Sequence, residues 1–123
     1  MSLEDLKEIL YKKLKLNKAA DIHQLSVEHL RHAGEEVLGH VLEVINGLLE
    51  HVEYMSASEV KTGCAPFIYK GKKKPVNQHK SYRRVTIGPL ITRILEEYIR
   101  SLTVPIYKPN QNINQYGFTE GMD

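Results

Sequence analysis

Apolar residues recur every three or four positions between residues 37 and 52, and this spacing most constrains how the chain can fold. The series is Val37, Leu38, Val41, Leu42, Ile45, Leu48, Leu49 and Val52. Because an α-helix has about 3.6 residues per turn, these side chains share one face, which must be buried against other elements. The sequence therefore predicts a packed helical region that begins near Ser26 as N-cap and is divided by Gly34 into a short and a long piece.

Two further segments carry the same helical spacing. Residues 1–16 are predicted to form an N-terminal amphipathic helix capped by Ser2, with an apolar stripe of Leu3, Leu6, Leu10 and Leu14. Residues 90–102 repeat the pattern, and this helix is expected to start at Gly88-Pro89, with proline in its first turn as helices prefer. Pro105 and Pro109 are expected to end this second helix, because proline cannot continue a helical ladder.

Two short apolar runs predict the strands of a β-hairpin. The runs are CAPFIYK, which begins at Cys64, and YRRVTI, which begins at Tyr82. A short helix is expected just before them at Ser58–Lys61, with Gly63 ending it. The predicted fold class is thus α+β, mainly helical with one β-hairpin. A length of 123 residues with 41% apolar content suffices for a modest core, as one domain or as a piece of a larger one.

The segment that joins the two strands is strongly basic. Residues 70–84, KGKKKPVNQHKSYRR, hold seven Lys or Arg residues and no acid. Residues 1–59 carry 6 basic and 11 acidic side chains, a net charge of −5, whereas residues 60–123 carry 11 and 4, a net charge of +7. Such a cluster is typical of a surface that binds phosphates, to which Lys offers a compact charge and Arg a two-pronged donor. From charge alone a solvated lysine loop is the better interpretation, and both interpretations stay open.

Other residues with reactive or ligating side chains form no persuasive site. His29 and His32 lie one helical turn apart with Glu36 next on that face, but no fourth metal ligand is evident, so surface histidines are the preferred interpretation. Cys64 is the only cysteine, which excludes an internal disulfide, and a small buried strand residue explains it better than a nucleophile. The glycine spacing of a phosphate-binding P-loop is absent.

Carboxylates and apolar runs exclude further classes of protein. The chain has three aspartates, Asp5, Asp21 and Asp123, and none belongs to the acidic cluster that two-metal phosphoryl transfer requires. No apolar run approaches the roughly 20 residues of a membrane span, and the acidic N-terminus does not resemble a secretory signal. An intracellular protein, nuclear or cytoplasmic, without a membrane partner is therefore expected.

Four stretches of the chain resemble the motifs of one protein family, in the same order. They are NKAADIHQLSVEHLRHAG, KTGCAPFIYKGKKK, KSYRRVTIGPLITRILEEYI and NQYGFTEGMD. They resemble the reverse transcriptase domain of non-LTR, LINE-like retrotransposons. In that family the first stretch is written NKAPGIDGLSAEHLKHAG, the third NYRPISL-P---KILEKII and the fourth QFGFRKG-ST. The second stretch matches the family's strand with a proline, a hydrophobic pair and a lysine before a basic loop. The resemblance covers residues 17–123, and four motifs in order make it strong.

The resemblance implies that residues 17–123 form the fingers and the palm edge of an incomplete right-hand polymerase. Its fingers hairpin holds the triphosphate of the incoming nucleotide through one Lys and one Arg, which by position are Lys70 and Arg83. Further cations of the hairpin are expected to bind nucleic acid: Lys72, Lys73, Lys74, Lys80 and Arg84. The family also places one segment near the template and the nucleotide, here Gln115, Tyr116, Gly117 and Phe118.

The departures from the family pattern bear on activity. Arg84 replaces the proline after the YR pair, and Ala20–Gln24 replaces the PGIDG turn, with the loss of both glycines and the aspartate. Pro66 stands one place early. In the family, a first Mg²⁺-binding aspartate follows the QYGF segment, and a Y-x-D-D box comes later still. Asp123 fits neither of these two positions. We therefore expect a non-catalytic, decayed fragment of the domain, without a metal or another cofactor of its own.

Two alternatives come from other classes of function. The chain is either a retained module that binds RNA or DNA through its hairpin, or a small helical module that binds a protein through the stripe of residues 37–52. Exposure of that stripe would also promote self-association.

Overall fold

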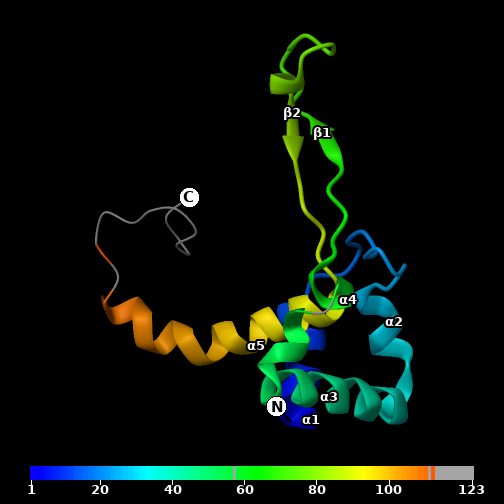
Figure 1. Ribbon diagram of the computed structural model, residues 1–123, viewed down its shortest axis with the longest axis vertical. Coiled ribbons are helices and arrows are strands. Elements are labelled where there is room, and N and C mark those ends of the chain that lie inside the picture. Colours follow the sequence, from blue (N-terminus) through cyan, green and yellow to red (C-terminus); the bar gives the residue numbers. More distant parts are fainter. Residues whose placement is uncertain (57, 111, 113–123) are drawn as a thin grey trace.

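The computed structural model of this chain describes residues 1–56, 58–110 and 112. It is mostly helical with one two-stranded antiparallel sheet, which confirms the predicted combination of helices and a hairpin. The helices pack into one body, from which the second half of α5 extends to one side and the hairpin projects in another direction (Figure 1). In chain order the elements are α1 (Leu3–Glu8), a π-helical turn (Ile9–Lys13), α2 (Val27–His32), α3 (Gly34–Glu50), a 3₁₀ turn (Val52–Ser56), α4 (Ser58–Lys61), β1 (Phe67–Tyr69), a 3₁₀ turn (His79–Ser81), β2 (Tyr82–Arg84), α5 (Leu90–Tyr107) and a last 3₁₀ turn (Lys108–Asn110).

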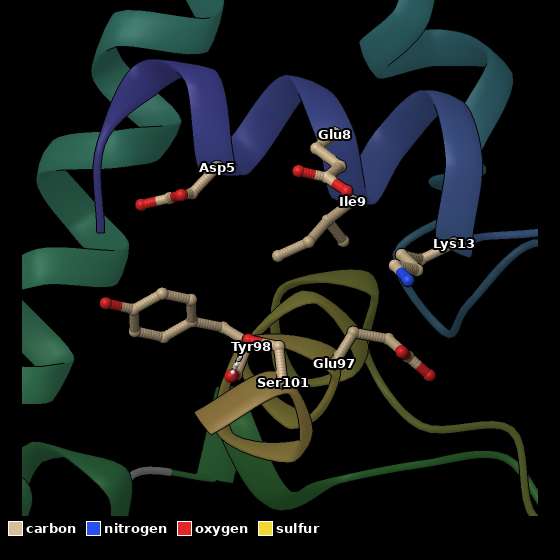
Figure 2. A pocket seen from close by; sticks show the side chains of 7 residues that line it. All are labelled: Asp5, Glu8, Ile9, Lys13, Glu97, Tyr98 and Ser101. Carbon is tan, nitrogen blue, oxygen red and sulfur yellow. Dashed lines mark hydrogen bonds between the residues drawn. The ribbon is translucent and has the colours of Figure 1, made fainter. Parts of the chain in front are cut away.

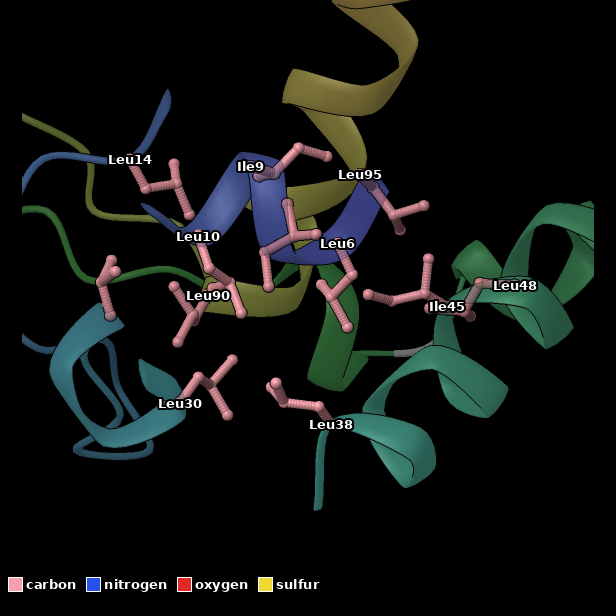
Figure 3. Packing of buried hydrophobic residues seen from close by; sticks show 12 residues of the cluster. Leu6, Ile9, Leu10, Leu14, Leu30, Leu38, Ile45, Leu48, Leu90 and Leu95 are labelled. Atoms are coloured by element: carbon pink, nitrogen blue, oxygen red, sulfur yellow. The ribbon is translucent and has the colours of Figure 1, made fainter. Parts of the chain in front are cut away.

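We call α1 and the π-helical turn that follows it the first helical segment. The core lies where this segment crosses α3 and α5 (Figure 3). Each helix contributes apolar side chains three or four residues apart, because only that spacing keeps them on the buried face. The buried set is Leu6, Ile9, Leu10, Leu14, Val27, Leu30, Leu38, Ile45, Leu48, Leu90, Ile94 and Leu95. Residues of 1–16 thus share one core with α3 and α5, while the predicted domain boundary after residue 16 stays a prediction.

The first helical segment begins as the sequence predicts. Ser2 is the N-cap: its hydroxyl accepts the backbone N–H of Asp5 at 3.1 Å, and the Asp5 carboxylate accepts the backbone N–H of Ser2 at 2.9 Å. The backbone and side-chain hydrogen bonds from Ser2 lower the pKa of the Asp5 carboxyl. This reciprocal pair gives two backbone N–H groups of the first turn, those of Ser2 and Asp5, a hydrogen-bond acceptor, so α1 has a defined start.

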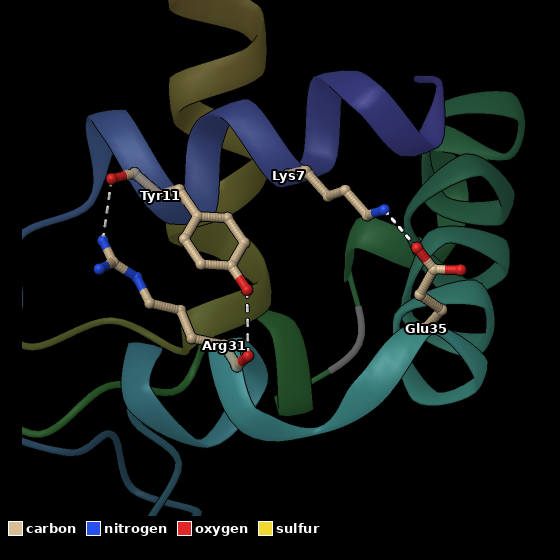
Figure 4. Close-up of polar contacts among 4 residues, drawn as sticks. All are labelled: Lys7, Tyr11, Arg31 and Glu35. Carbon is tan, nitrogen blue, oxygen red and sulfur yellow. Dashed lines mark hydrogen bonds and ion pairs between the residues drawn. The ribbon is translucent and has the colours of Figure 1, made fainter.

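The same segment ends in a clamp made by Arg31 of α2 (Figure 4). Its guanidinium donates to the carbonyl oxygens of Leu10 at 2.7 Å, Tyr11 at 3.2 Å and Leu14 at 3.1 Å. The Tyr11 hydroxyl donates back to the carbonyl of Arg31 at 3.1 Å, and the guanidinium carbon lies 5.2 Å from the centre of the Tyr11 ring. Carbonyls at a helix end lack partners in their own helix, so Arg31 joins this end to α2.

The predicted stripe of residues 37–52 packs mostly within this chain. Leu38, Ile45 and Leu48 are buried, and Val41, Leu42 and Leu49 are partly buried against the core. The two ends of the stripe, Val37 and Val52, are exposed. The break between α2 and α3 falls at Gly34 as predicted. Its φ of +80° lies in the left-handed region, which glycine adopts without strain.

The helix α5 differs from the sequence prediction at both ends. It begins at Leu90 with Pro89 as its N-cap, so Pro89 is not in the first turn. Pro105 does not end the helix, because α5 continues to Tyr107. Proline removes one hydrogen bond from the ladder, and in the last turn this loss is small enough for the helix to continue. The backbone N–H of Lys108 still donates to the carbonyl of Val104.

The loop between the first helical segment and α2 contains a residue under strain. Gln24 has a φ of +63°, a left-handed conformation that costs a residue with a side chain roughly 1 kcal/mol. In the family that the sequence is predicted to resemble, this position is the second glycine of the PGIDG turn. The backbone conformation that favours glycine is therefore present at this position, although the glycine is not.

Candidate nucleic-acid interface

The hairpin is fixed to the body at its base. Cys64 and Ile87 form an isolated antiparallel bridge, with N···O distances of 3.0 and 2.7 Å, and the N–H of Val85 donates to the carbonyl of Pro66 at 3.2 Å. Gly63 is needed here because a Cβ at this position would lie 2.7 Å from the Ile87 oxygen. This close approach explains Gly63 better than a left-handed helix end after α4, because Gly63 does not have the positive φ of such an end.

The prediction that Cys64 is a small buried residue is wrong: its side chain is exposed. The bridge to Ile87 uses only the backbone of Cys64, and the hairpin projects from the body at this point, so no core surrounds the thiol.

The two strands pair in a register that alternates their side chains between two faces. Phe67 lies opposite Arg84, Ile68 opposite Arg83, and Tyr69 opposite Tyr82. The pairing continues one step further, because the N–H of Lys70 donates to the carbonyl of Ser81 at 2.8 Å. Successive side chains of a strand point to opposite faces.

One face therefore carries the proposed phosphate-binding pair. Lys70 and Arg83 lie on it as diagonal neighbours on opposite strands, together with Ile68. The Lys70 ammonium donates to the carbonyl of Lys80 at 2.7 Å, which orients it and leaves two of its three N–H donors for a ligand. We call this side the Lys70–Arg83 face.

The remaining predicted cations surround the tip of the hairpin. They are all exposed: Lys72, Lys73 and Lys74 at the turn, Lys80 on the returning chain, and Arg84 on the face opposite Arg83. Within the described part of the chain, no acidic side chain forms an ion pair with any of the hairpin's cations. Their positive charge is therefore not compensated locally, which favours an anionic ligand.

The loop folds back on the two strands through tyrosine hydroxyls. The Tyr82 hydroxyl donates to the carbonyl of Val76 at 2.8 Å, and the Tyr69 hydroxyl donates to the carbonyl of Lys74. At the turn Gly71, Lys72 and Lys73 all have positive φ, between 55° and 66°. This left-handed run reverses the chain and sends its lysine side chains outward.

The aspartates that the structure describes both have structural roles. Asp5 caps α1, and Asp21 is buried, with 4% of its surface exposed. Asp21 Oδ1 accepts the N–H groups of His23 and Leu25, each at 2.9 Å, and its Oδ2 accepts the N–H of Leu90 at 2.8 Å. Burial raises the pKa of this carboxyl, but the three backbone donors outweigh burial, and the pKa lies below its ordinary value.

Sequence reasoning missed the role of Asp21, which joins the loop before α2 to the start of α5, 69 residues away. An aspartate followed by a polar turn is a signal for local hydrogen bonds to the backbone, and the bonds to His23 and Leu25 follow it. The bond to Leu90 has no signal in the sequence.

His29, one of the predicted histidine pair, also bonds to the backbone. The Nδ1 atom of His29 accepts the backbone N–H of Ser26, the N-cap of α2, at 3.0 Å. In residues 1–56, 58–110 and 112, no three His, Cys, Asp or Glu side chains lie together as ligands for a metal. His29 is thus part of a helix start.

A cavity of about 140 Å³ lies between the first helical segment and α5 (Figure 2). Its polar lining is mostly acidic, with Asp5, Glu8 and Glu97 against a single Lys13. Because these carboxylates repel phosphates, this cavity is not a candidate for the anionic ligand that the hairpin attracts. It lies on the body, away from the hairpin (Figures 1 and 2).

The segment Gln115, Tyr116, Gly117 and Phe118 lies outside the described residues, so its predicted place near template and nucleotide stays a prediction. None of the helices in the described residues has the length and apolar character of a membrane span. Comparisons with protein-family models, with curated proteins and with solved structures found no match to this chain.

Proposed function

We propose that the chain is the fingers part of a LINE-like reverse transcriptase domain and that its hairpin binds the phosphates of nucleotides and nucleic acid. The observation that carries the proposal is the strand register, because it sets Lys70 and Arg83 on one face of a projecting hairpin without an acidic side chain. The four sequence motifs support the family, and the uncompensated charge supports the ligand.

The proposal does not include catalysis by this chain. Two-metal phosphoryl transfer needs carboxylates that are free to hold cations, and Asp5 and Asp21 already accept backbone N–H groups in the fold. We therefore expect no primer extension by the purified protein with an RNA template, a DNA primer, deoxynucleoside triphosphates and Mg²⁺. Template-dependent extension would overturn this part of the proposal.

Nucleic-acid binding is tested by its dependence on salt. Each phosphate that a cation neutralises on a single strand contributes about 0.7 to the slope of log affinity against log salt. Replacing Lys70, Lys72, Lys73 and Lys74 together by Ala should reduce that slope by up to about 3 for a fluorescent single-stranded RNA measured by anisotropy.

The matched control replaces four exposed lysines of the body by Ala: Lys12, Lys13, Lys15 and Lys18. This variant has the same net charge as the hairpin variant, so a general effect of charge would change both equally. Equal slopes for the two variants would show that the hairpin is merely solvated.

Binding of the nucleotide triphosphate is tested by two neighbouring arginines. Arg83→Ala and Lys70→Ala should each weaken binding of dTTP in isothermal titration about tenfold, since a charge-assisted hydrogen bond contributes about 1.5–3 kcal/mol. Arg84→Ala is the matched control, because Arg84 is adjacent in sequence but lies on the opposite face. An equal loss in both arginine variants would contradict the Lys70–Arg83 face as the triphosphate site.

The second candidate function is a retained, non-catalytic module that binds RNA or DNA. It is favoured by the exposed lysines at the tip, Lys72, Lys73 and Lys74, which extend the charge beyond the Lys70–Arg83 face. This module would bind single-stranded RNA or DNA in a salt-sensitive way without measurable affinity for dTTP. The helical protein-interaction alternative loses support, because Leu38, Ile45 and Leu48 of its stripe are buried within the chain.

A further inference from the structure

The second face of the hairpin is aromatic. The register places Phe67, Tyr69 and Tyr82 on the face opposite Lys70 and Arg83, with Arg84 beside Phe67. The rings of Tyr69 and Tyr82 lie 5.7 Å apart, centre to centre, and are tilted by 57°. The hairpin thus presents an aromatic surface on one side and the Lys70–Arg83 face on the other.

This aromatic face is hollowed. Phe67, Tyr82 and His79 of the 3₁₀ turn line a hollow of about 340 Å³ whose lining is almost wholly apolar. Only these three residues line it, so it is an open, shallow hollow on which a planar group can lie and not an enclosed pocket. The three rings come from three segments, β1, the 3₁₀ turn and β2, so the hollow exists only because the hairpin folds.

The two tyrosine rings are oriented before any ligand binds. Their hydroxyls donate to the carbonyls of Lys74 and Val76. A ring held at its hydroxyl loses less side-chain entropy when a ligand stacks on it. The free-energy cost of ordering the ring on binding is therefore smaller, and the ligand binds more tightly. Phe67 has no such anchor and is 71% exposed, although water solvates its ring poorly. An exposed ring of this kind contributes nothing to the core of the body.

The cations around the hollow indicate which ligand covers it. Arg84 lies on the same face as the rings, and Lys72, Lys73 and Lys74 crowd the tip. Planar apolar surface surrounded by cations fits unpaired bases joined by phosphates, since bases stack on aromatic rings while cations follow the backbone. A duplex hides its base faces within its own stack and cannot use the rings in this way.

We infer that the aromatic face of the hairpin stacks the unpaired bases of a single-stranded nucleic acid, with Phe67, His79 and Tyr82 as the stacking residues. The inference rests on the proposed binding of nucleic acid by the hairpin, and it adds a substrate class: single strands, read by stacking rather than by charge alone. Because every base has a π-face, this contact tolerates all base sequences.

The test compares three probes of different chemistry: a single-stranded (dT)12, an abasic 12-mer of the same charge, and a 12-base-pair duplex. The expected result is that (dT)12 binds about tenfold more tightly than the abasic strand, since stacking contributes 1–3 kcal/mol per base. Phe67→Ala should remove most of this difference and leave the affinity for the abasic strand unchanged. Val44→Ala is the matched control, since Val44 is a 55% exposed apolar residue of α3 and lies on neither face of the hairpin.

A direct signal of stacking is available because the sequence contains no tryptophan. Phe67→Trp should show fluorescence quenching when (dT)12 is added, but none with the abasic strand, whereas Val44→Trp on α3 should show none with either. Equal affinities for (dT)12 and the abasic strand, or equal quenching in both tryptophan variants, would overturn the inference and leave the proposed function intact. If neither strand binds, both fail.

Two further outcomes would also overturn the inference. If the duplex binds as tightly as (dT)12, unpaired bases are not what the aromatic face recognises. If the protein is a dimer in solution and Phe67→Ala makes it a monomer, the aromatic face contacts a second copy of this chain instead.

Discussion

The helical body and the projecting hairpin use their apolar residues in opposite ways. In the body twelve apolar side chains close on one another and are buried. In the hairpin Phe67, Ile68 and Tyr69 are all exposed, and none of the described helices covers either face of the strands (Figure 1). The buried contacts that stabilise the fold therefore lie in the body, whereas the exposed apolar surface of the hairpin is accessible to a ligand. Substitutions should therefore separate the two regions cleanly.

The largest effect is expected in the core of the body. Leu6→Ala should lower the free energy of unfolding by about 4 kcal/mol, because the fully buried side chain leaves a cavity among α1, α3 and α5. Urea denaturation followed by circular dichroism measures this change. Ile68→Ala, in the hairpin, should change the same quantity by less than about 0.5 kcal/mol. A loss above 2 kcal/mol in the Ile68 variant would contradict the separation.

The next effect concerns Asp21, which joins the loop to α5. Asp21→Ala should destabilise the protein by about 3 kcal/mol, because it leaves the buried N–H of Leu90 without an acceptor. Asp21→Asn keeps one oxygen and should lose less. Urea denaturation at pH 7 checks the order of the two variants, and an equal, small loss in both would show that water replaces the carboxylate.

The same residue makes stability depend on pH. Its pKa in the folded protein lies below the ordinary value of about 3.9 in an unfolded chain, so the folded state favours the carboxylate. This contribution is present above the unfolded pKa and is lost as the pH falls through the folded pKa. The wild type should therefore lose stability between about pH 5 and pH 2 more steeply than Asp21→Ala in urea titrations. Parallel curves would contradict the assignment.

A smaller loss is expected at the clamp between α2 and the first helical segment. Arg31→Ala removes three donors from backbone carbonyls and should cost about 2 kcal/mol in urea denaturation. Arg31→Lys keeps the charge but lacks the forked geometry, so it should recover less than half of the loss. Full recovery by Lys would show that charge alone maintains the contact.

The smallest effect should be a gain. Gln24→Gly relieves the left-handed strain at φ +63° but increases the entropy of the unfolded chain, so the net stabilisation should be about 0.5 kcal/mol. Thermal unfolding of the variant beside Gln24→Ala measures it, because Ala keeps the strain. If Ala stabilises as much as Gly, the strain at this position is absent.

Prediction from the sequence succeeded where the signal is local. The caps at Ser2 and Ser26, the break at Gly34, and the two strands beside the basic loop all follow from patterns within a few residues. Prediction failed where the position of a residue in the fold decides the outcome. Pro105 is a helix breaker by rule but falls in a last turn that tolerates it, and Cys64 belongs to an apolar run that no core covers.

For the candidate site, the cations can be read from the sequence, whereas the face of the hairpin on which each one lies is known only from the structure. Seven Lys or Arg residues within residues 70–84 are plain in the sequence, but the choice of Lys70 and Arg83 came from a family resemblance. The aromatic face was missed, although Phe67 and Tyr69 alternate with other residues in a period of two that marks one side of a strand. Only the register adds Tyr82 to this face.

The sequence by itself determined the helices, the hairpin and its charge, because periodicity and composition act through neighbours along the chain. Only the tertiary structure decided that Asp21 binds Leu90, that Arg31 clamps the first helical segment, and that Phe67 and Tyr82 share a hollow with His79. These contacts join residues from separate segments, and their geometry depends on strand register and helix packing, which no local pattern encodes.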